Sequence, residues 1–363
     1  MTPRSAIADV EIAPLDREAM GAAADRLDRL TKPPGSLGRL EALAIQLAGI
    51  RGELVTDIRR PAIIVFAADH GVTIRGVSPY PSAVTRQMVA NFAAGGAAIN
   101  VLARAVGADL VVVDVGVAGA PIAAPAPAPG ASPSTVRFVA DRAASGTRDL
   151  SVEPAMTPAE AAAAIGVGRR TVAELIDAGA DLVAVGEMGI GNTTAASALV
   201  AALTGRPADA VTGRGTGLDE AGVRRKAALI DAAIRHHRLR ADDPETILVA
   251  VGGLEIAALV GAILEAASRR VPLLLDGFIT GAAALVAARL MPAATPRLIA
   301  AHRSAEPGHA VALDELRLDP LLALDLRLGE GSGAALAIPI VRAAARILGE
   351  MATFEEAAVS NRD

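Results

Sequence analysis

Residues 181–197, "DLVAVGEMGIGNTTAAS", decide the fold of this chain. Their first half is a short, continuous aliphatic run, which is typical of a strand that is buried on both faces of a parallel sheet. Their second half passes through Gly186, Gly189 and Gly191 into an Ala-rich segment with helical character. The stretch therefore predicts a strand, a tight glycine turn and a helix, which is the repeating unit of a parallel α/β sheet.

Five further aliphatic runs of the same kind occur along the chain. They are "AIIVFAA" (62–68), "DLVVVDVGV" (109–117), "TILVAVGG" (246–253), "VPLLLDG" (271–277) and "RLIAAH" (297–302). Segments with helical character lie between the runs, at 82–106, 158–178, 193–203, 219–237 and 254–268. This alternation predicts a mainly parallel six-stranded sheet with helices on both faces, whose ligands bind beyond the carboxyl ends of the strands.

The two ends of the chain differ from this pattern. Residues 14–52 look like two helices separated by the turn "KPPGSLG" (32–38), and residues 336–358 look like another helix. We interpret 1–55 and 336–363 as one small helical subdomain, and 56–335 as a large α/β domain that binds nucleotide and base. The Pro- and Ala-rich stretch 120–135 predicts an exposed connection.

Composition narrows the class of protein. The net charge of −5 over 363 residues provides no basic field for a phosphate backbone, so we expect no nucleic-acid partner. The absence of cysteine excludes disulfides, thiolate nucleophiles and Cys-based zinc sites, and it favours a reducing compartment, so we expect a cytoplasmic protein. The N-terminal segment has no apolar core of a signal peptide, and we expect no membrane span because the longest apolar stretches, 256–268 and 277–288, are too short or interrupted.

The predicted turn after the 181–188 strand is the best candidate for an anion site. Unpaired backbone N–H groups and the positive end of the helix dipole would face a ligand there. No Gly-Lys-Ser/Thr follows, so the segment is not a Walker motif. Glu187 would repel a phosphate at this position unless it contacts the other end of the ligand. The alternative is that the glycine turn is purely structural and binds no ligand.

Three other segments place polar residues where chemistry could occur. In "AADHGV" (67–72), Asp69 and His70 are adjacent and would point in different directions, so a hydrogen-bonded structural turn is favoured over acid–base catalysis. In "GRGTGLDEAGVRRKAALI" (213–230), the three adjacent basic residues 224–226 cannot all face one ligand, and a solvated helix face is the alternative. In "AAHRSAEPGHAVAL" (300–313), His302 and His309 are seven residues apart, which does not match the i, i+4 spacing of a zinc site.

Together these segments resemble a known enzyme family. The matching blocks are "LTKPPGSLGRLE" (30–41), "AADHGV", "VSPYPSAVTRQMVANFAAGGAAIN" (77–100), "GEMGIGNTT" (186–194), "GRGTGLDE" (213–220), "LLLDGFITGAAAL" (273–285), "HRSAEPGH" (302–309) and "LRLGEGSGAALA" (326–337). In this order they are similar to the nicotinate-nucleotide:dimethylbenzimidazole phosphoribosyltransferases, over nearly the whole chain. The resemblance implies a Rossmann-like large domain, a small helical domain and a homodimer.

The resemblance also implies a reaction. In it, 5,6-dimethylbenzimidazole displaces nicotinate from C1′ of nicotinate mononucleotide, which gives α-ribazole 5′-phosphate for the nucleotide loop of cobalamin. Nicotinate leaves as a neutral ring nitrogen, so the reaction needs a base rather than an acid, and neither a metal nor a redox cofactor is required. The resemblance assigns that base to Glu330, an acid between two glycines directly before an apolar run, and it places Glu187 near the ribose.

Carrying the motifs over residue by residue implies two sets of binding residues. The phosphoribosyl contacts are Gly189, Gly191, Asn192, Thr193, Gly215, Lys226 and Ser304, and the benzimidazole contacts are Tyr80, Pro81, Met88 and Leu328. An ordinary, partly buried aromatic is the alternative for Tyr80.

Two other functions remain as alternatives. A transferase that uses 5-phosphoribosyl diphosphate would carry two adjacent acids after a strand and a Thr-rich loop, which the sequence lacks. A non-catalytic sensor would bind nicotinate mononucleotide without needing Glu330. The sequence leaves open which base is preferred and whether a partner subunit completes the site.

Overall fold

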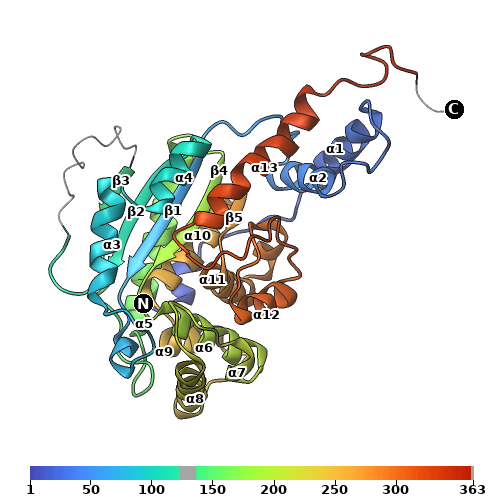
Figure 1. The fold of residues 1–363 in the computed structure, drawn as a ribbon. Coiled ribbons are helices and arrows are strands. Elements are labelled where there is room, and N and C mark those ends of the chain that lie inside the picture. Colours follow the sequence, from blue (N-terminus) through green and yellow to red (C-terminus); the bar gives the residue numbers. More distant parts are fainter. Residues whose placement is uncertain (123–135, 361–363) are drawn as a thin grey trace.

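The computed structural model describes residues 1–122 and 136–360, and its centre is a six-stranded parallel sheet (Figure 1). The strands are β1 (Pro61–Ala68), β2 (Asp109–Gly116), β3 (Val136–Ala140), β4 (Leu182–Met188), β5 (Leu273–Leu275) and β6 (Leu298–Ala300). They lie in the order β3–β2–β1–β4–β5–β6, and every neighbouring pair is parallel. The chain order reverses beside β1, and such a switch point is where open α/β sheets bind ligands.

Side chains of β1 alternate between two hydrophobic cores, because successive side chains of a strand point to opposite faces of the sheet. Ile64 and Phe66 face a core built with α5 (Pro158–Asp177), α6 (Asn192–Thr204), α10 (Leu254–Ser268) and α11 (Phe278–Leu290). Ile63 and Val65 face a second core on the other side of the sheet. All four side chains are fully buried. The predicted parallel sheet with helices on both faces is confirmed.

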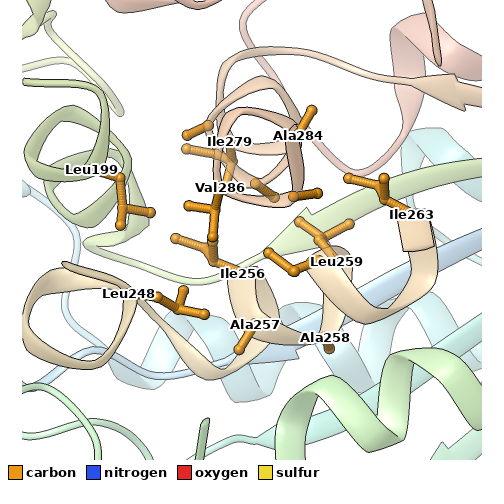
Figure 2. Close-up of a cluster of buried hydrophobic side chains, with 14 of the residues drawn as sticks. Leu199, Leu248, Ile256, Ala257, Ala258, Leu259, Ile263, Ile279, Ala284 and Val286 are labelled. Atoms are coloured by element: carbon orange, nitrogen blue, oxygen red, sulfur yellow. The ribbon is translucent and has the colours of Figure 1, made fainter. Parts of the chain in front are cut away.

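The predicted strand at 246–253 is wrong, because these residues form the helix α9 (Pro244–Val251). Asp243 accepts a hydrogen bond from the backbone N–H of Thr246, and Pro244 occupies the first helical position, where its missing N–H costs nothing. Leu248 of α9 lies beside Leu199 and Ile256 in the core (Figure 2). A buried helix and a buried strand have the same apolar composition over eight residues, so periodicity could not distinguish them.

The sixth strand is β3, which the sequence pattern did not reveal. It lies at the edge of the sheet beside β2, and its five residues are only partly buried or exposed. Arg137, the second residue of β3, pairs with Glu174 of α5 at the surface. Most of the predicted connection 120–135, which precedes β3, lies outside the described residues.

The predicted helix at 82–106 is two helices, α3 (Ala83–Ala94) and α4 (Ala98–Val106). Gly95 ends α3 with a φ of 85°, a left-handed conformation that glycine adopts without steric cost. The break lets the chain change direction, so that Phe92 of α3 and Ile99 of α4 both reach the second core.

Helices from the two ends of the chain meet at one end of the molecule (Figure 1). They are α1 (Arg17–Arg29), α2 (Arg39–Arg51) and α13 (Ser332–Glu350). α13 begins at Ser332 rather than at residue 336 and ends at Glu350, because Met351 has an extended backbone. The second core continues from the sheet into these three helices, so the division into 1–55 with 336–363 and 56–335 stays a prediction.

Two helical stretches, 83–106 and 332–350, are long and apolar enough to cross a membrane by length and composition alone. Because this test uses length and composition only, the predicted absence of a membrane span stays a prediction. The first stretch is interrupted at Gly95, and the second packs along the sheet and α2. Their apolar side chains contribute to the second core, which accounts for the composition of both.

Candidate active site

A cavity of about 390 Å³ lies beyond the carboxyl ends of β4, β5 and β6. Its walls are the segments that follow these three strands, the first half of α3 and the loop that leads into α13. The remaining helices, α7 (Ala208–Val211), α8 (Glu220–His236) and α12 (Pro307–Leu316), lie on the α6 side of the molecule. The cavity is thus at the edge of the sheet where the strand order predicts a ligand.

Most of the residues singled out from the sequence line this cavity. They are Tyr80, Met88, Glu187, Gly189, Asn192, Thr193, Gly215, Ser304, Leu328 and Glu330. Three others do not line it. Gly191 lies in the turn before α6 with a φ of 95°, Pro81 lies at the start of α3, and Lys226 reaches the site from behind Thr193.

Glu330 has a left-handed backbone, with a φ of 63°, between Gly329 at 79° and Gly331 at 83°. For a residue with a side chain this conformation costs about 1–2 kcal/mol. The surrounding structure holds it there: the N–H of Glu330 donates to the carbonyl of Glu187 over 3.2 Å, and the N–H of Ser332 donates to the carbonyl of Gly329 over 3.0 Å. The turn directs the carboxylate of Glu330 into the cavity wall.

Asp276 fixes the far side of the same turn. Its carboxylate accepts hydrogen bonds from the backbone N–H groups of Gly331 (3.2 Å), Gly333 (2.7 Å) and Ala334 (3.0 Å), which are free at the start of α13. Burial raises the pKa of the Asp276 carboxyl to about 7, although these three N–H groups lower it. Asp276 follows β5 directly, so the sheet itself positions the Glu330 turn.

A glycine in β4 lets this turn approach the sheet. A Cβ atom at Gly186 would overlap the backbone nitrogen of Gly331. The close approach requires a residue without a side chain, so any substitution of Gly186 would push the Glu330 turn away from Glu187.

The two glutamates of the cavity are both buried acids. Burial raises the pKa of Glu330 to about 7, with a further increase from Asp276 and a decrease from the N–H of Ile99. Burial also raises the pKa of Glu187 well above its ordinary value, and the carboxylates of Glu255, Asp276 and Glu330 raise it further. The amide of Asn192 donates to Glu187 and partly offsets this. A carboxyl group that titrates near neutral pH is suited to act as a general base.

Lys226 is the buried cation of the site. Its ammonium donates to Oγ1 of Thr193 over 2.7 Å, and burial lowers its pKa to about 8. The neighbouring Arg224 and Arg225 are exposed, so only one of the three adjacent basic residues faces inward. A Cβ at Gly215 would lie 2.8 Å from Oγ1 of Thr193 and 3.5 Å from Nζ of Lys226, which places Gly215 beside this pair. Backbone N–H groups of the 189–193 segment and this ammonium can together hold an anion.

Apolar side chains form another part of the cavity wall. Val84, Met88, Met188 and Ile190 line it, with Tyr80 and Leu328 as its more exposed members. Tyr80 is 53% exposed and Leu328 is 56% exposed, so these two lie at the mouth. A flat apolar ring would find a matching surface here.

Four ionisable residues of the cavity wall were not among the predicted site residues: Asp276, His302, Glu306 and Arg327. All four lie inside the sequence blocks quoted above, and Asp276 and His302 also lie at the ends of predicted strands. Glu306 accepts from the N–H of Gly215 over 2.9 Å, and Nε2 of His302 is 3.6 Å from the Asp276 carboxylate. Glu306 and His302 thus interact with residues that are distant in the sequence.

Asp69 and His70 are buried and hydrogen-bonded, and neither lines the cavity. Oδ2 of Asp69 accepts from the N–H of Ala118 over 2.8 Å, and the carbonyl of His70 accepts from the hydroxyl of Thr73. His309 accepts from the N–H of Ser304 through Nδ1, while His302 faces Asp276. The two histidines of the 300–313 segment therefore have different partners.

The chain is similar to proteins of known family over nearly its whole length. A family model described as "Phosphoribosyltransferase" matches residues 12–359. A protein of Chloroflexus aurantiacus named nicotinate-nucleotide–dimethylbenzimidazole phosphoribosyltransferase is 56% identical over 352 residues, which is 97% of each chain. A protein of the same name from Bradyrhizobium diazoefficiens is 51% identical over 352 residues, which is 97% of this chain and 96% of that one.

A solved structure has the same fold. The crystal structure of CobT from Thermus thermophilus superposes with a TM-score of 0.89 at 48% sequence identity. The match covers 95% of this chain and 100% of that chain.

Proposed function

The chain belongs to the nicotinate-nucleotide–dimethylbenzimidazole phosphoribosyltransferase family, and from that premise we propose how its cavity performs the transfer. Nicotinate mononucleotide gives its 5-phosphoribosyl group to 5,6-dimethylbenzimidazole, and the products are nicotinate and α-ribazole 5′-phosphate. One observation carries the assignment of roles. The buried carboxylate of Glu330 lines the same cavity as the apolar side chains of Tyr80, Met88 and Leu328.

The leaving group needs no acid. The ring nitrogen of nicotinate is positively charged while it is bonded to C1′, and it takes the bonding electrons and leaves neutral. Positive charge develops on the ribose at the same time. The buried carboxylates of Glu187 and Glu330 favour this charge, because charges interact strongly in a site that excludes water.

The incoming base loses one proton. One nitrogen of dimethylbenzimidazole forms the new bond to C1′, and its other N–H becomes acidic. Glu330 accepts that proton, and its pKa of about 7 matches the working range of a general base. The carboxyl group of Glu187, which is bonded to Asn192, is left to contact the ribose.

The phosphate is placed on the turn before α6. Backbone N–H groups of the 189–193 segment are at the positive end of that helix, and Lys226 stands behind Thr193. Gly215 and Ser304 complete this part of the wall. This assignment leaves the apolar side chains of Tyr80, Met88 and Leu328 for the incoming base.

We also propose that the chain works as a cytoplasmic homodimer. The family resemblance supports the dimer, and the exposed apolar side chains of Tyr80 and Leu328 at the cavity mouth are a surface that a second copy would cover. The absence of cysteine supports a reducing compartment. Light scattering should give twice the 36.6 kDa of one chain, and fractionation of the native host should find the protein in the cytoplasm.

The activity is tested by measuring nicotinate release from nicotinate mononucleotide across a panel of benzimidazole, purine and phenolic bases. Release that depends on an added base, with dimethylbenzimidazole among the best, is the expected result. Binding of the mononucleotide without release for any base would replace the transferase assignment by that of a sensor.

A further inference from the structure

A buried ion pair lies directly behind the cavity and has no part in the chemistry described above. Nε2 of His70 is 2.7 Å from Oε1 of Glu255, and both side chains are completely buried. His70 follows β1, and Glu255 is the second residue of α10, 185 positions away. Neither residue lines the cavity. A buried charge pair is costly to desolvate, so its presence needs a reason beyond stability.

The ring of His70 supports the turn that leads from β4 to α6. A Cβ at Gly189 would lie 3.3 Å from Cδ2 and 3.4 Å from Nε2 of His70, and a Cβ at Gly191 would lie 3.3 Å from Cβ of His70. On the side of α10, a Cβ at Gly253 would overlap Cε1 of the ring. Two glycine backbones, Gly189 and Gly253, therefore lie against the imidazole, and Gly191 lies against the Cβ of His70. Gly189 and Gly191 belong to the proposed phosphate turn.

The charges around His70 are largely acidic. Asp69, directly after β1, and Glu255, on α10, both raise its pKa. The segment 147–149 packs against Gly71, but its Arg148 is paired with Glu160 and its Asp149 with Arg75. Burial lowers the pKa of His70, yet the two acids outweigh this and the pKa is raised above 6.5. The 2.7 Å contact with Glu255 therefore favours the protonated form of the imidazole.

Glu255 also acts on the active site. Four groups on four different segments influence the pKa of Glu187: Asn192 on α6, Glu255 on α10, Asp276 after β5 and Glu330 before α13. After burial, Glu255 is the strongest influence that raises the pKa of Glu187. A bare carboxylate at Glu255 would favour the protonated form of Glu187, and the positive charge of His70 opposes this.

We propose that His70 and Glu255 form a positioning pair for the transferase, in which the imidazolium supports the 189–191 turn and shields Glu187 from the charge of Glu255. The proposal rests on the proposed function. Both are positioning residues, because they act on the substrate through Gly189, Gly191 and Glu187 rather than by contact. The proposal requires the charges of His70 and Glu255, and not only their shapes, to set the protonation of Glu187.

The test is a double-mutant cycle read out as a pH profile. His70→Gln keeps a donor near the place of Nε2 but removes the positive charge, so the acidic limb of kcat/KM for nicotinate mononucleotide should move to higher pH by about one unit, which is a tenfold loss on that limb. Glu255→Gln should not move the acidic limb of kcat/KM to higher pH. Adding Glu255→Gln to His70→Gln should return the limb to that of Glu255→Gln alone.

The control is Glu265→Gln, which breaks a different ion pair of α10, the one with Arg169. It should leave the pH profile unchanged. A purely structural pair predicts a different pattern, in which each change lowers kcat at all pH values and the double variant is worst. That pattern, or a His70→Gln profile that coincides with the wild type, would overturn the proposal.

A second measurement needs no active variant. Histidine labelled with ¹³C at ε1 gives one signal for each of the five histidines, and the signal of His70 is identified by its loss in His70→Gln. It should show an imidazolium at pH 7 in the wild type and a neutral ring in Glu255→Gln. A neutral ring in the wild type would overturn the proposal. Absence of any nicotinate release by the wild type would refute the proposed function instead, while this titration would still test the pair.

Discussion

The backbone N–H of Glu330 donates to the carbonyl of Glu187 over 3.2 Å, so the two buried acids of the cavity are joined through the main chain as well as through their charges. Glu187 is the next-to-last residue of β4, and Glu330 lies in the turn before α13. A displacement of either segment would change the position of both carboxylates. A substitution that changes the shape of one acid would therefore also move the other, so the two roles can be distinguished only with substitutions that preserve shape.

Glu330→Gln should keep the fold and the affinity for both substrates while lowering kcat by about 10²–10⁴, the usual contribution of a positioned base. Glutamine has nearly the same shape and can adopt the same left-handed backbone at the same cost. Single-turnover kinetics with nicotinate mononucleotide and dimethylbenzimidazole would measure the loss. Turnover at the wild-type rate would show that Glu330 is not the base and would make Glu187 the candidate.

The same substitution should stabilise the protein at alkaline pH. The pKa of Glu330 is raised to about 7 in the folded state from its ordinary 4.5, so the folded protein binds the proton more tightly than the unfolded chain. Stability from this group is therefore fully present below pH 4.5 and is lost as the pH rises through 7.

Glu330→Gln removes that loss, because glutamine does not ionise. Its free energy of unfolding should exceed that of the wild type at pH 8 by an amount on the order of 1–3 kcal/mol, and the two should converge near pH 4. Urea unfolding at the two pH values checks this. A variant that is less stable than the wild type at pH 8 would mean that the carboxylate is not buried as a charge in the free protein.

Lys226→Met should raise KM for nicotinate mononucleotide by about 10- to 100-fold, because it removes both the positive charge behind the phosphate turn and the charge-assisted hydrogen bond to Thr193, and such bonds contribute roughly 1.5–3 kcal/mol. Nicotinate riboside, which has no phosphate, should be a poor substrate for the wild type and should lose little more in the variant. The matched control is Arg225→Met, which removes an exposed cation from the adjacent position of α8. If Lys226→Met weakened the use of nucleotide and riboside equally, the phosphate would not bind in this part of the cavity.

The product should be the α-riboside, since one displacement inverts the β-linked carbon of the substrate. Glu187 could instead attack C1′ and be displaced by the base, as the second carboxylate of retaining glycosidases does, and the product would then be β. Inversion is favoured because the pyridinium is already a good leaving group and Glu330 is needed for the benzimidazole proton. The anomeric proton signal of the product decides between them, and a β-riboside would contradict both the mechanism and the role of Glu330.

Local sequence pattern was sufficient for the parallel sheet, and the family resemblance supplied most of the residues that line the cavity wall. Continuous aliphatic runs indicate strands that are buried on both faces, and glycines with polar residues after such runs indicate loops at one edge of the sheet. Sequence pattern gave the wrong element where a strand and a helix have the same apolar pattern. The run 246–253 satisfies both a buried strand and the buried helix α9, and the half-exposed edge strand β3 has too little apolar character to be recognised.

Only the tertiary structure decided how the acids of the site are held and charged. Asp276 organises the Glu330 turn across a separation of 55 residues, and His70 meets Glu255 across 185. The identity of each residue is visible in the sequence, but its pKa depends on burial and on which charges lie within a few ångströms. Those quantities arise when the chain packs its strand ends together, so no local pattern contains them.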